Sequence, residues 1–271
     1  MQKNKKDILI SIGFVLILII VFITNIFSKD KEISIAERRK LVQFPEITTK
    51  RILNGTVSKE FEEYAMDQFV GRDVLRSIKA LFNFEIYRQK DNNKLFIEND
   101  SIYKTEYPLK EELIEKTSKQ INQIKDEYLK GMNVYYSIIP DKNYFLENDN
   151  LKIDYEKIEN IMEQNLQDMK YINLFDELSG EDYYRTDIHW KQENIRKVVS
   201  KIEKEMKLND TSKTKYEEKQ LDNFYGVYYG QIGIKVEPDK IKYLTNDTIE
   251  NCITYNFETK QERKGLWFGK I

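Results

Sequence analysis

The sequence has little cysteine, histidine or proline: one Cys, one His and four Pro among 271 residues. A single cysteine, Cys252, excludes an intrachain disulfide, so the fold must rest on core packing, which a chain of this length can supply. We interpret Cys252 as a small buried residue, because no base lies near it in sequence. With no Pro-rich or Gly/Ser-rich stretch, composition indicates no linker, and we expect one soluble domain.

Neither positive nor negative charge is in large excess. The 44 basic and 46 acidic residues give a net charge of −2 and a pI of about 5.8. No basic excess is available to neutralise a phosphate backbone, so nucleic acid is not an expected partner. One histidine and one cysteine disfavour the usual zinc sites, and we expect neither a metal nor another cofactor.

One long hydrophobic run is present, at residues 8–27. Its 20 uncharged residues, ILISIGFVLILIIVFITNIF, form a helix that spans roughly the 30 Å hydrocarbon core of a bilayer. A cleaved signal peptide is the alternative, but this run is longer than an ordinary signal core and no A-x-A-like site follows it. The sequence therefore predicts a single transmembrane helix that contacts the lipid bilayer.

The short tail 1–7 suggests the orientation of this helix. Lys3, Lys5 and Lys6 lie directly before the span with one acid, Asp7. Positive charges that flank a span favour the cytoplasmic side. We expect a single-pass protein of the cell membrane with the tail in the cytoplasm and the domain outside.

Two amphipathic helices are predicted in the following segment, 28–108. Phe61, Tyr64, Ala65 and Phe69 repeat at helical spacing, and a second stripe follows a break near Gly71. We assign both stripes to a hydrophobic core. The second stripe comprises Val74, Leu75, Ile78, Leu81, Phe82 and Ile86.

Helices alternate with strands in the segment 109–271. Apolar runs at 134–139 and 171–175 are separated by helical patterns, which is typical of βαβ units and a parallel sheet. Beyond Asp210 the helical period disappears, and we expect antiparallel strands in this β-rich part. The expected strands are 224–229, 232–236, 241–244 and 252–257.

Candidate site residues follow the two expected parallel strands, at 140–143 and 183–190. Loops after parallel strands gather at one sheet edge, where ligands bind. His189 is the only histidine, and Asp187 stands two positions before it. In an extended segment both side chains share a face, so Asp187 could orient the ring while His189 acts as a base. A structural pair that fastens the loop is the simpler alternative, and a carboxylate-rich cation site is a third.

Further residues of the two loops are candidates for lining a substrate crevice. Asp141 and Lys142 either line it or form a solvated turn after Pro140. The other candidate substrate-binding residues are Tyr184, Arg185 and Trp190.

The octapeptide YYRTDIHW resembles the motif of the DHHW protein family of bacterial envelopes, with Ile188 at the first of its two histidine positions. Similar blocks occur in the same order at 43–73, 138–145 and 224–233. The resemblance implies an SGNH-like or flavodoxin-like α/β fold, a parallel sheet flanked by helices, related to exopolysaccharide O-acetyltransferases and esterases that act on surface carbohydrate. It further implies Asp187 as orienting residue and His189 as general base.

The serine nucleophile of those enzymes has no counterpart in this chain. It lies in an Asp-Ser-Tyr or Asp-Ser-Phe turn, and neither tripeptide occurs in the sequence. Ser137 falls inside the expected strand 134–139, and Ser179 lies in a different kind of loop. We therefore expect an SGNH-like domain that is truncated at its C-terminus and inactive. The alternative is a non-catalytic, membrane-anchored glycan-binding or scaffold protein.

We predict that residues 28–271 are extracytoplasmic and that the N-terminal helix is retained. Protease added to intact spheroplasts should degrade the domain, because it lies on the side that the protease reaches. Protection of the domain would reverse the orientation. A mature N-terminus near residue 29 would instead identify a cleaved signal peptide.

Overall fold

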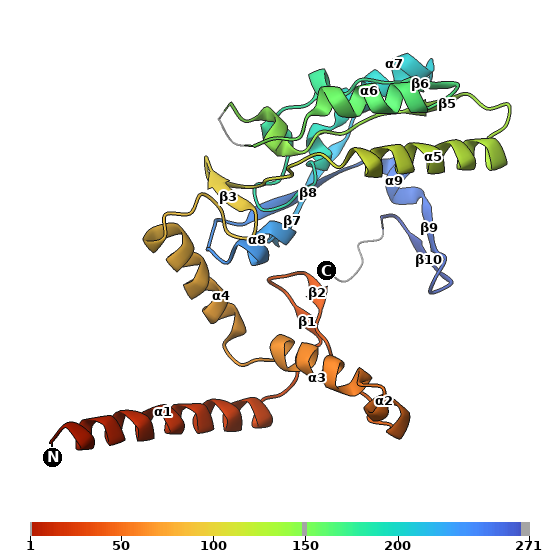
Figure 1. Ribbon diagram of the computed structural model, residues 1–271. Coiled ribbons are helices and arrows are strands. Elements are labelled where there is room, and N and C mark those ends of the chain that lie inside the picture. Colours follow the sequence, from red (N-terminus) through yellow and green to blue (C-terminus); the bar gives the residue numbers. More distant parts are fainter. Residues whose placement is uncertain (1, 148–150, 267–271) are drawn as a thin grey trace. The chain divides into compact units, whose positions relative to one another are not determined.

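The computed structural model describes residues 2–147 and 151–266 and divides the chain into two compact units (Figure 1). Unit 1 comprises Met1–Asn93 and Tyr229–Lys235, and unit 2 comprises Lys94–Tyr228 and Val236–Ile271. The first division lies closer to the N-terminus than the boundary expected at residue 108. The second part of unit 1 comes from the expected β-rich region, so unit 1 depends on contacts that are distant in sequence.

Unit 1 begins with the apolar helix α1 (Gln2–Phe27). Its segment Lys5–Phe27 is long and apolar enough to cross a membrane, and none of this segment is buried in the protein. The predicted apolar N-terminal helix is thus confirmed. Membrane anchors and signal sequences share this length and composition.

The rest of unit 1 is a short antiparallel hairpin followed by helices. The hairpin consists of β1 (Ile33–Ser34) and β2 (Arg39–Lys40). Gly71, with a φ of 78°, separates the last two α-helices at the predicted position, and glycine adopts this left-handed conformation without strain. The helical elements are α2 (Thr49–Leu53), α3 (Thr56–Asp67), α4 (Arg72–Leu81) and the π-helical turn η1 (Phe82–Ile86).

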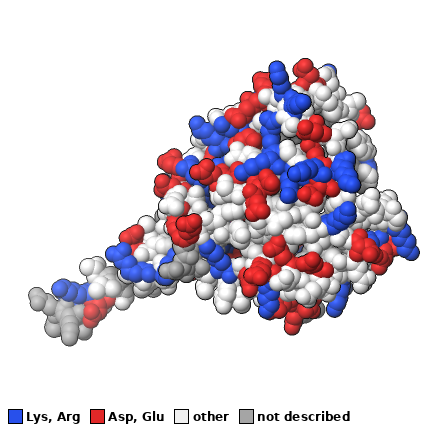
Figure 2. Space-filling view, turned by 90° about the horizontal axis from the view of Figure 1, so that it is seen from above, with Lys and Arg blue, Asp and Glu red and all other residues white. Residues whose placement is uncertain are grey.

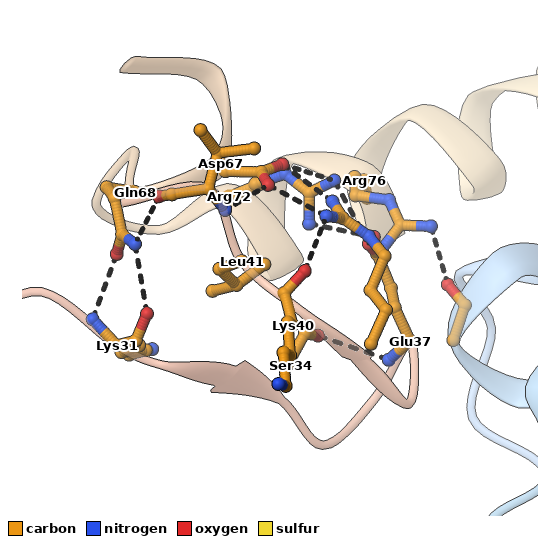
Figure 3. Close-up of polar contacts among 12 residues, drawn as sticks. Lys31, Ser34, Glu37, Lys40, Leu41, Asp67, Gln68, Arg72 and Arg76 are labelled. Atoms are coloured by element: carbon orange, nitrogen blue, oxygen red, sulfur yellow. Dashed lines mark hydrogen bonds and ion pairs between the residues drawn. The ribbon is translucent and has the colours of Figure 1, made fainter. Parts of the chain in front are cut away.

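Glu37 is the centre of an ion-pair network that joins the hairpin to α3 and α4 (Figure 3). Its carboxylate lies 2.5 Å from Arg39 and 2.7 Å from Arg72, also contacts Arg76, and is only 8% exposed. Burial raises the pKa of Glu37, but hydrogen bonds from Arg72 and Arg39 outweigh it and hold the pKa below its usual value. Hydrogen bonds from Arg39 likewise lower the pKa of Asp67 to about 2.

The expected core stripes of α3 and α4 are exposed, so that prediction is wrong. Val74, Leu75 and Ile78 are 62%, 53% and 44% exposed, whereas Arg72 and Arg76 turn inward to Glu37. Apolar periodicity identifies a stripe but does not say which stripe is buried. Here the buried side of α4 is determined by the carboxylate that its arginines bind.

Unit 2 contains an antiparallel hairpin, three long helices and a series of short elements (Figure 1). Short 3₁₀ turns flank the predicted site loop 183–190. In chain order to the third long helix, the elements are β3 (Leu95–Glu98), β4 (Ser101–Lys104), α5 (Glu111–Tyr128), β5 (Val134–Tyr136), η2 (Lys142–Phe145), α6 (Tyr155–Asn165), β6 (Met169–Tyr171), η3 (Phe175–Glu177), η4 (Gly180–Asp182), η5 (Gln192–Asn194) and α7 (Arg196–Met206).

The parallel pairing of the two strands is confirmed, with Val134 opposite Met169 and Tyr136 opposite Tyr171. Their bounds differ from the expected ones, because β5 ends at Tyr136 and β6 shares only Tyr171 with the expected run 171–175. The expected larger parallel sheet is not found, because every sheet in the described part of the chain has two strands. The chain after α7 enters β7 (Glu217–Phe224), most of whose residues are at least partly exposed. An inner strand of a parallel sheet needs both faces buried, so this polar strand is unsuited to extending β5–β6.

The C-terminal region is antiparallel, as expected. β7 pairs with β8 (Asp239–Thr245), and β9 (Ile253–Asn256) pairs with β10 (Gln261–Lys264) after helix α9 (Asp247–Asn251). Two of the expected strands are confirmed, because β8 contains 241–244 and β9 lies within 252–257. The expected strand 224–229 is wrong beyond Phe224, where β7 ends, and α8 (Val227–Ile232) follows. No strand is formed at 232–236. Cys252 is exposed, which corrects its interpretation as buried.

Two hydrophobic clusters hold unit 2 together around β5 and β6. In one, Ile158 and Met162 of α6 pack with α5 residues, including Ile121. In the other, Leu174 and Val198 connect the segment after β6 to α7. Trp190 packs against this second cluster, so the end of the 183–190 loop is fixed to the core.

Replacing Glu37 by Gln should lower the free energy of unfolding by about 1–3 kcal/mol, because three arginines lose a buried anionic partner. A carboxyl whose pKa is lowered on folding stabilises the fold above its unfolded pKa, near 4.5, and this contribution disappears as the pH falls through the folded value. Denaturant titrations at about pH 7 and about pH 3 should therefore show a difference between the two proteins that shrinks in acid.

The control for this prediction is Glu46→Gln. Glu46 pairs with Arg51 at 3.3 Å, but its side chain is 77% exposed, so its removal should change stability little. Equal losses in both variants would contradict the central role of Glu37.

Candidate functional site

Asp187 and His189 meet within hydrogen-bond distance, as their spacing predicts. Nδ1 of His189 lies 2.6 Å from Oδ1 of Asp187, and the His189 backbone N–H donates to the same oxygen at 3.0 Å. The Asp187 side chain is 2% exposed, whereas the His189 side chain is 77% exposed. Among the described residues, Nε2 of His189 has no hydrogen-bond partner. A buried carboxylate thus holds one ring nitrogen while the other stays accessible.

The carboxylate of Asp187 is kept ionised by the groups around it. Its second oxygen accepts the backbone N–H of Val227, the first residue of α8, at 2.8 Å. Burial raises the pKa of Asp187, but the hydrogen bonds from Val227 and His189 outweigh this effect and hold it below the usual value. An ionised Asp187 favours a proton on Nδ1 of His189, which leaves a lone pair on Nε2 of the neutral ring.

Gly226 allows the segment before α8 to approach the Asp187 turn at backbone distance. A Cβ atom added at Gly226 would lie 2.3 Å from the Thr186 carbonyl oxygen and 2.4 Å from Cβ of Asp187. The Gly226 N–H donates to the Thr186 hydroxyl at 2.9 Å, and the Tyr228 N–H donates to the Thr186 carbonyl at 3.1 Å. Only glycine leaves room for these contacts.

Asp239, at the start of β8, supports the same turn from another direction. It is 5% exposed and accepts hydrogen bonds from the Arg185 N–H, the Thr186 N–H and the Thr186 hydroxyl at 2.8, 2.8 and 2.6 Å. Sequence reasoning missed Thr186, Asp239 and Val227. No local pattern in the sequence connects Thr186 with Asp239, because the two residues are far apart along the chain. The block 224–233, which contains Gly226, is the one signal that points to this region.

Lys142 is buried beneath the loop and is only 3% exposed, which excludes the solvated turn considered from the sequence. Its Nζ donates to the carbonyls of Tyr184 and Arg185, each at 2.8 Å. It also lies 5.2 and 5.4 Å from the ring centres of Tyr103 and Tyr228. Burial lowers the pKa of Lys142 to about 7, although the carboxylates of Asp239, Asp187 and Asp141 oppose this effect. The geometry gives Lys142 a positioning role toward the loop backbone.

The other predicted substrate-binding residues are engaged in the fold to different degrees. Asp141 accepts hydrogen bonds from the Asn143 N–H and the Tyr155 hydroxyl, both at 2.7 Å. Tyr184 is buried against Phe224, with 5.1 Å between ring centres. The charged side chain of Arg185 is 39% exposed and is therefore accessible to a ligand. Substrate binding by these residues stays a prediction.

The two predicted loops do come together, because the Tyr183 hydroxyl donates to the Pro140 carbonyl at 2.6 Å in addition to the Lys142 contacts. An antiparallel bridge between Tyr183 and Trp190 closes the second loop around Asp187 and His189. Within residues 2–147 and 151–266, no group of three or more His, Cys, Asp or Glu side chains is placed to hold a metal ion. The arrangement can accept a proton at Nε2 or bind a hydrogen-bond donor there.

Comparison with known proteins finds one kind of likeness. No family model matches the sequence, and no curated protein matches it. Among solved structures, the chain is similar to a DHHW family protein from Eubacterium siraeum DSM 15702, with a TM-score of 0.46 and 14% identity. The match covers 55% of this chain and 53% of that one, about half of each. The family printed for that structure is the one that the octapeptide of this chain resembles.

Replacing Gly226 by Ala should displace the Asp187 turn and lower the free energy of unfolding by about 1–3 kcal/mol, because the added methyl group overlaps the Thr186 backbone. The single imidazole of His189 should change its NMR signal in the same variant. Gly180→Ala is the matched control, since its Cβ would make an ordinary 3.7 Å contact with Phe145. An unchanged imidazole signal in Gly226→Ala would contradict the close approach.

Proposed function

We propose that this chain is a membrane-anchored, DHHW-type, SGNH-like protein of the bacterial cell envelope whose Asp187–His189 pair is the base half of an acyl-transfer site. Its substrate class is surface carbohydrate, as in related O-acetyltransferases and esterases. The observation that carries the proposal is the contrast within the pair: a buried carboxylate at Nδ1 and an exposed ring with a free Nε2.

This geometry suits proton transfer from a hydroxyl group. Nε2 of His189 would accept the hydroxyl proton while the oxygen attacks an acyl carbon, and Asp187 would stabilise the resulting imidazolium ion. The imidazolium would then return the proton to the leaving oxygen as its bond to the acyl carbon breaks. The Thr186, Gly226 and Asp239 contacts would keep the ring in place during this step. A precise ring position matters because proton transfer requires hydrogen-bond distance.

The hydroxyl that would carry the acyl group is the missing component. Among the described residues, no serine hydroxyl contacts Nε2 of His189. Ser179 donates to Asp182 at 2.9 Å. Ser137 lies just beyond β5 and is exposed, which corrects its placement inside a strand. We propose that these 271 residues have no serine-dependent turnover of their own.

The anchor and location complete the proposal. Residues 8–27 cross the cell membrane, with the tail 1–7 in the cytoplasm and the folded part outside. Acidic and basic side chains are interspersed on the face shown in Figure 2, which offers no single-sign surface for a polyanion there. A neutral glycan fits such a face better than a nucleic acid does.

A non-catalytic glycan-binding or scaffold role is the second candidate, favoured by the absence of a nucleophile at His189. Little aromatic surface in this loop is accessible to a glycan, because Tyr183 and Tyr184 are 3% and 8% exposed and Trp190 packs on the core. Glycan binding at this loop would instead use the exposed His189 ring and Arg185.

A chromogenic acetyl ester tests the catalytic part of the proposal. We expect the wild-type chain and His189→Ala to hydrolyse the ester at the same background rate, because no acyl acceptor within residues 2–147 and 151–266 contacts His189. Turnover that disappears in His189→Ala would contradict the inactive assignment. Ser137→Ala, tested beside it, would then identify or eliminate the exposed serine after β5 as the nucleophile.

A further inference from the structure

Unit 1 has an apolar groove of about 720 Å³ between α3 and α4. Phe61, Met66 and Phe69 line it on one side, and Leu75 and Lys79 line it on the other. The charged residues Glu62, Arg72 and Arg76 also contribute to its wall. Met66 and Leu75 are 57% and 53% exposed. A water-soluble surface rarely leaves so many large apolar side chains together, so this face has the character of an interaction surface.

The exposed face of α4 extends the groove. Val74, Ile78 and Leu81 are 62%, 44% and 50% exposed, whereas Arg72 and Arg76 point to Glu37 inside unit 1 (Figure 3). In a surface helix of a soluble protein the apolar side faces the core and the charged side faces water, and α4 has the reverse arrangement. Its charged stripe is satisfied within unit 1, and its apolar stripe faces outward.

Hydrogen bonds connect the junction of α3 and α4 to the end of the apolar helix α1. The Val70 N–H donates to the side chain of Asn25, in the last turn of α1, at 2.9 Å. The Tyr64 hydroxyl donates to Asp30 at 2.9 Å, and Gln68 exchanges hydrogen bonds with the backbone of Lys31. The groove thus begins beside the residues at which the chain leaves α1.

We propose that the groove and the outer stripe of α4 dock on the surface of the bilayer that α1 spans. This inference rests on the proposed membrane anchor. The hydrogen bonds at Asn25 and Asp30 place the apolar face at the level of the headgroups, where an amphipathic helix buries its apolar side about 5–10 Å deep. Lys79, which is exposed and lines the groove, would lie near the lipid phosphates. Burial of the stripe in lipid accounts for its exposure in the protein.

Fluorescence quenching by lipid tests this docking in the full chain. A Cys252→Ser background removes the native thiol, and Leu75→Cys is labelled with an environment-sensitive fluorophore. The protein is placed in nanodiscs of phosphatidylethanolamine and phosphatidylglycerol, with or without brominated acyl chains. We expect brominated lipid to quench the label. Ile78→Cys repeats the measurement at a second position, so that one misfolded variant does not decide the result.

Two matched positions serve as controls, since Leu75, Leu113 and Leu16 are 53%, 55% and 52% exposed. Leu113→Cys, on α5 of unit 2, should not be quenched, and Leu16→Cys, inside α1, should be. Loss of quenching at Leu16 would overturn the anchor itself. Quenching at Leu16 without quenching at Leu75 and Ile78 would overturn the docking alone. A label at Leu75 that is blue-shifted but unquenched, with crosslinks between copies, would assign the face to a second copy instead.

Discussion

The close backbone approach of Gly226 to Thr186 and Asp187 is the constraint on which the candidate site depends. Without a side chain at Gly226, the first residues of α8 reach the turn and donate their N–H groups to it. The buried Asp187 carboxylate is then satisfied by backbone N–H groups and one imidazole, and no arginine or lysine among the described residues forms an ion pair with it. The exposed His189 ring takes its orientation from this buried group.

Unit 1 uses a buried carboxylate for a different purpose. Glu37 binds three arginines and draws the charged stripe of α4 inward, which leaves apolar side chains outside. In unit 2 the buried Asp187 instead holds a titratable ring at the surface. In both cases a carboxylate that would be costly to bury alone is stabilised by several donors, and its position determines what the neighbouring element exposes.

Local patterns predicted part of this architecture. The apolar helix, the break at Gly71, the β5–β6 pairing and the Asp187–His189 contact follow from features within a few residues or from strand–helix alternation. Three features could not be predicted in this way: which face of α4 is buried, the start of a helix at Val227, and the hydrogen bonds of Asp239 to the Thr186 turn. They depend on partners distant in sequence: Glu37 for Arg76, the Thr186 turn for Gly226, and Thr186 for Asp239.

The tautomer of His189 tests the central claim most directly, and the protein's single histidine gives an unambiguous ¹⁵N NMR signal. If the buried Asp187 orients the ring, the neutral imidazole carries its proton on Nδ1, and Asp187→Asn changes the tautomer balance. Comparison at a pH where the ring is neutral should therefore show different ring ¹⁵N shifts in the two proteins. Identical shifts, or a proton on Nε2 in the unaltered chain, would contradict the account.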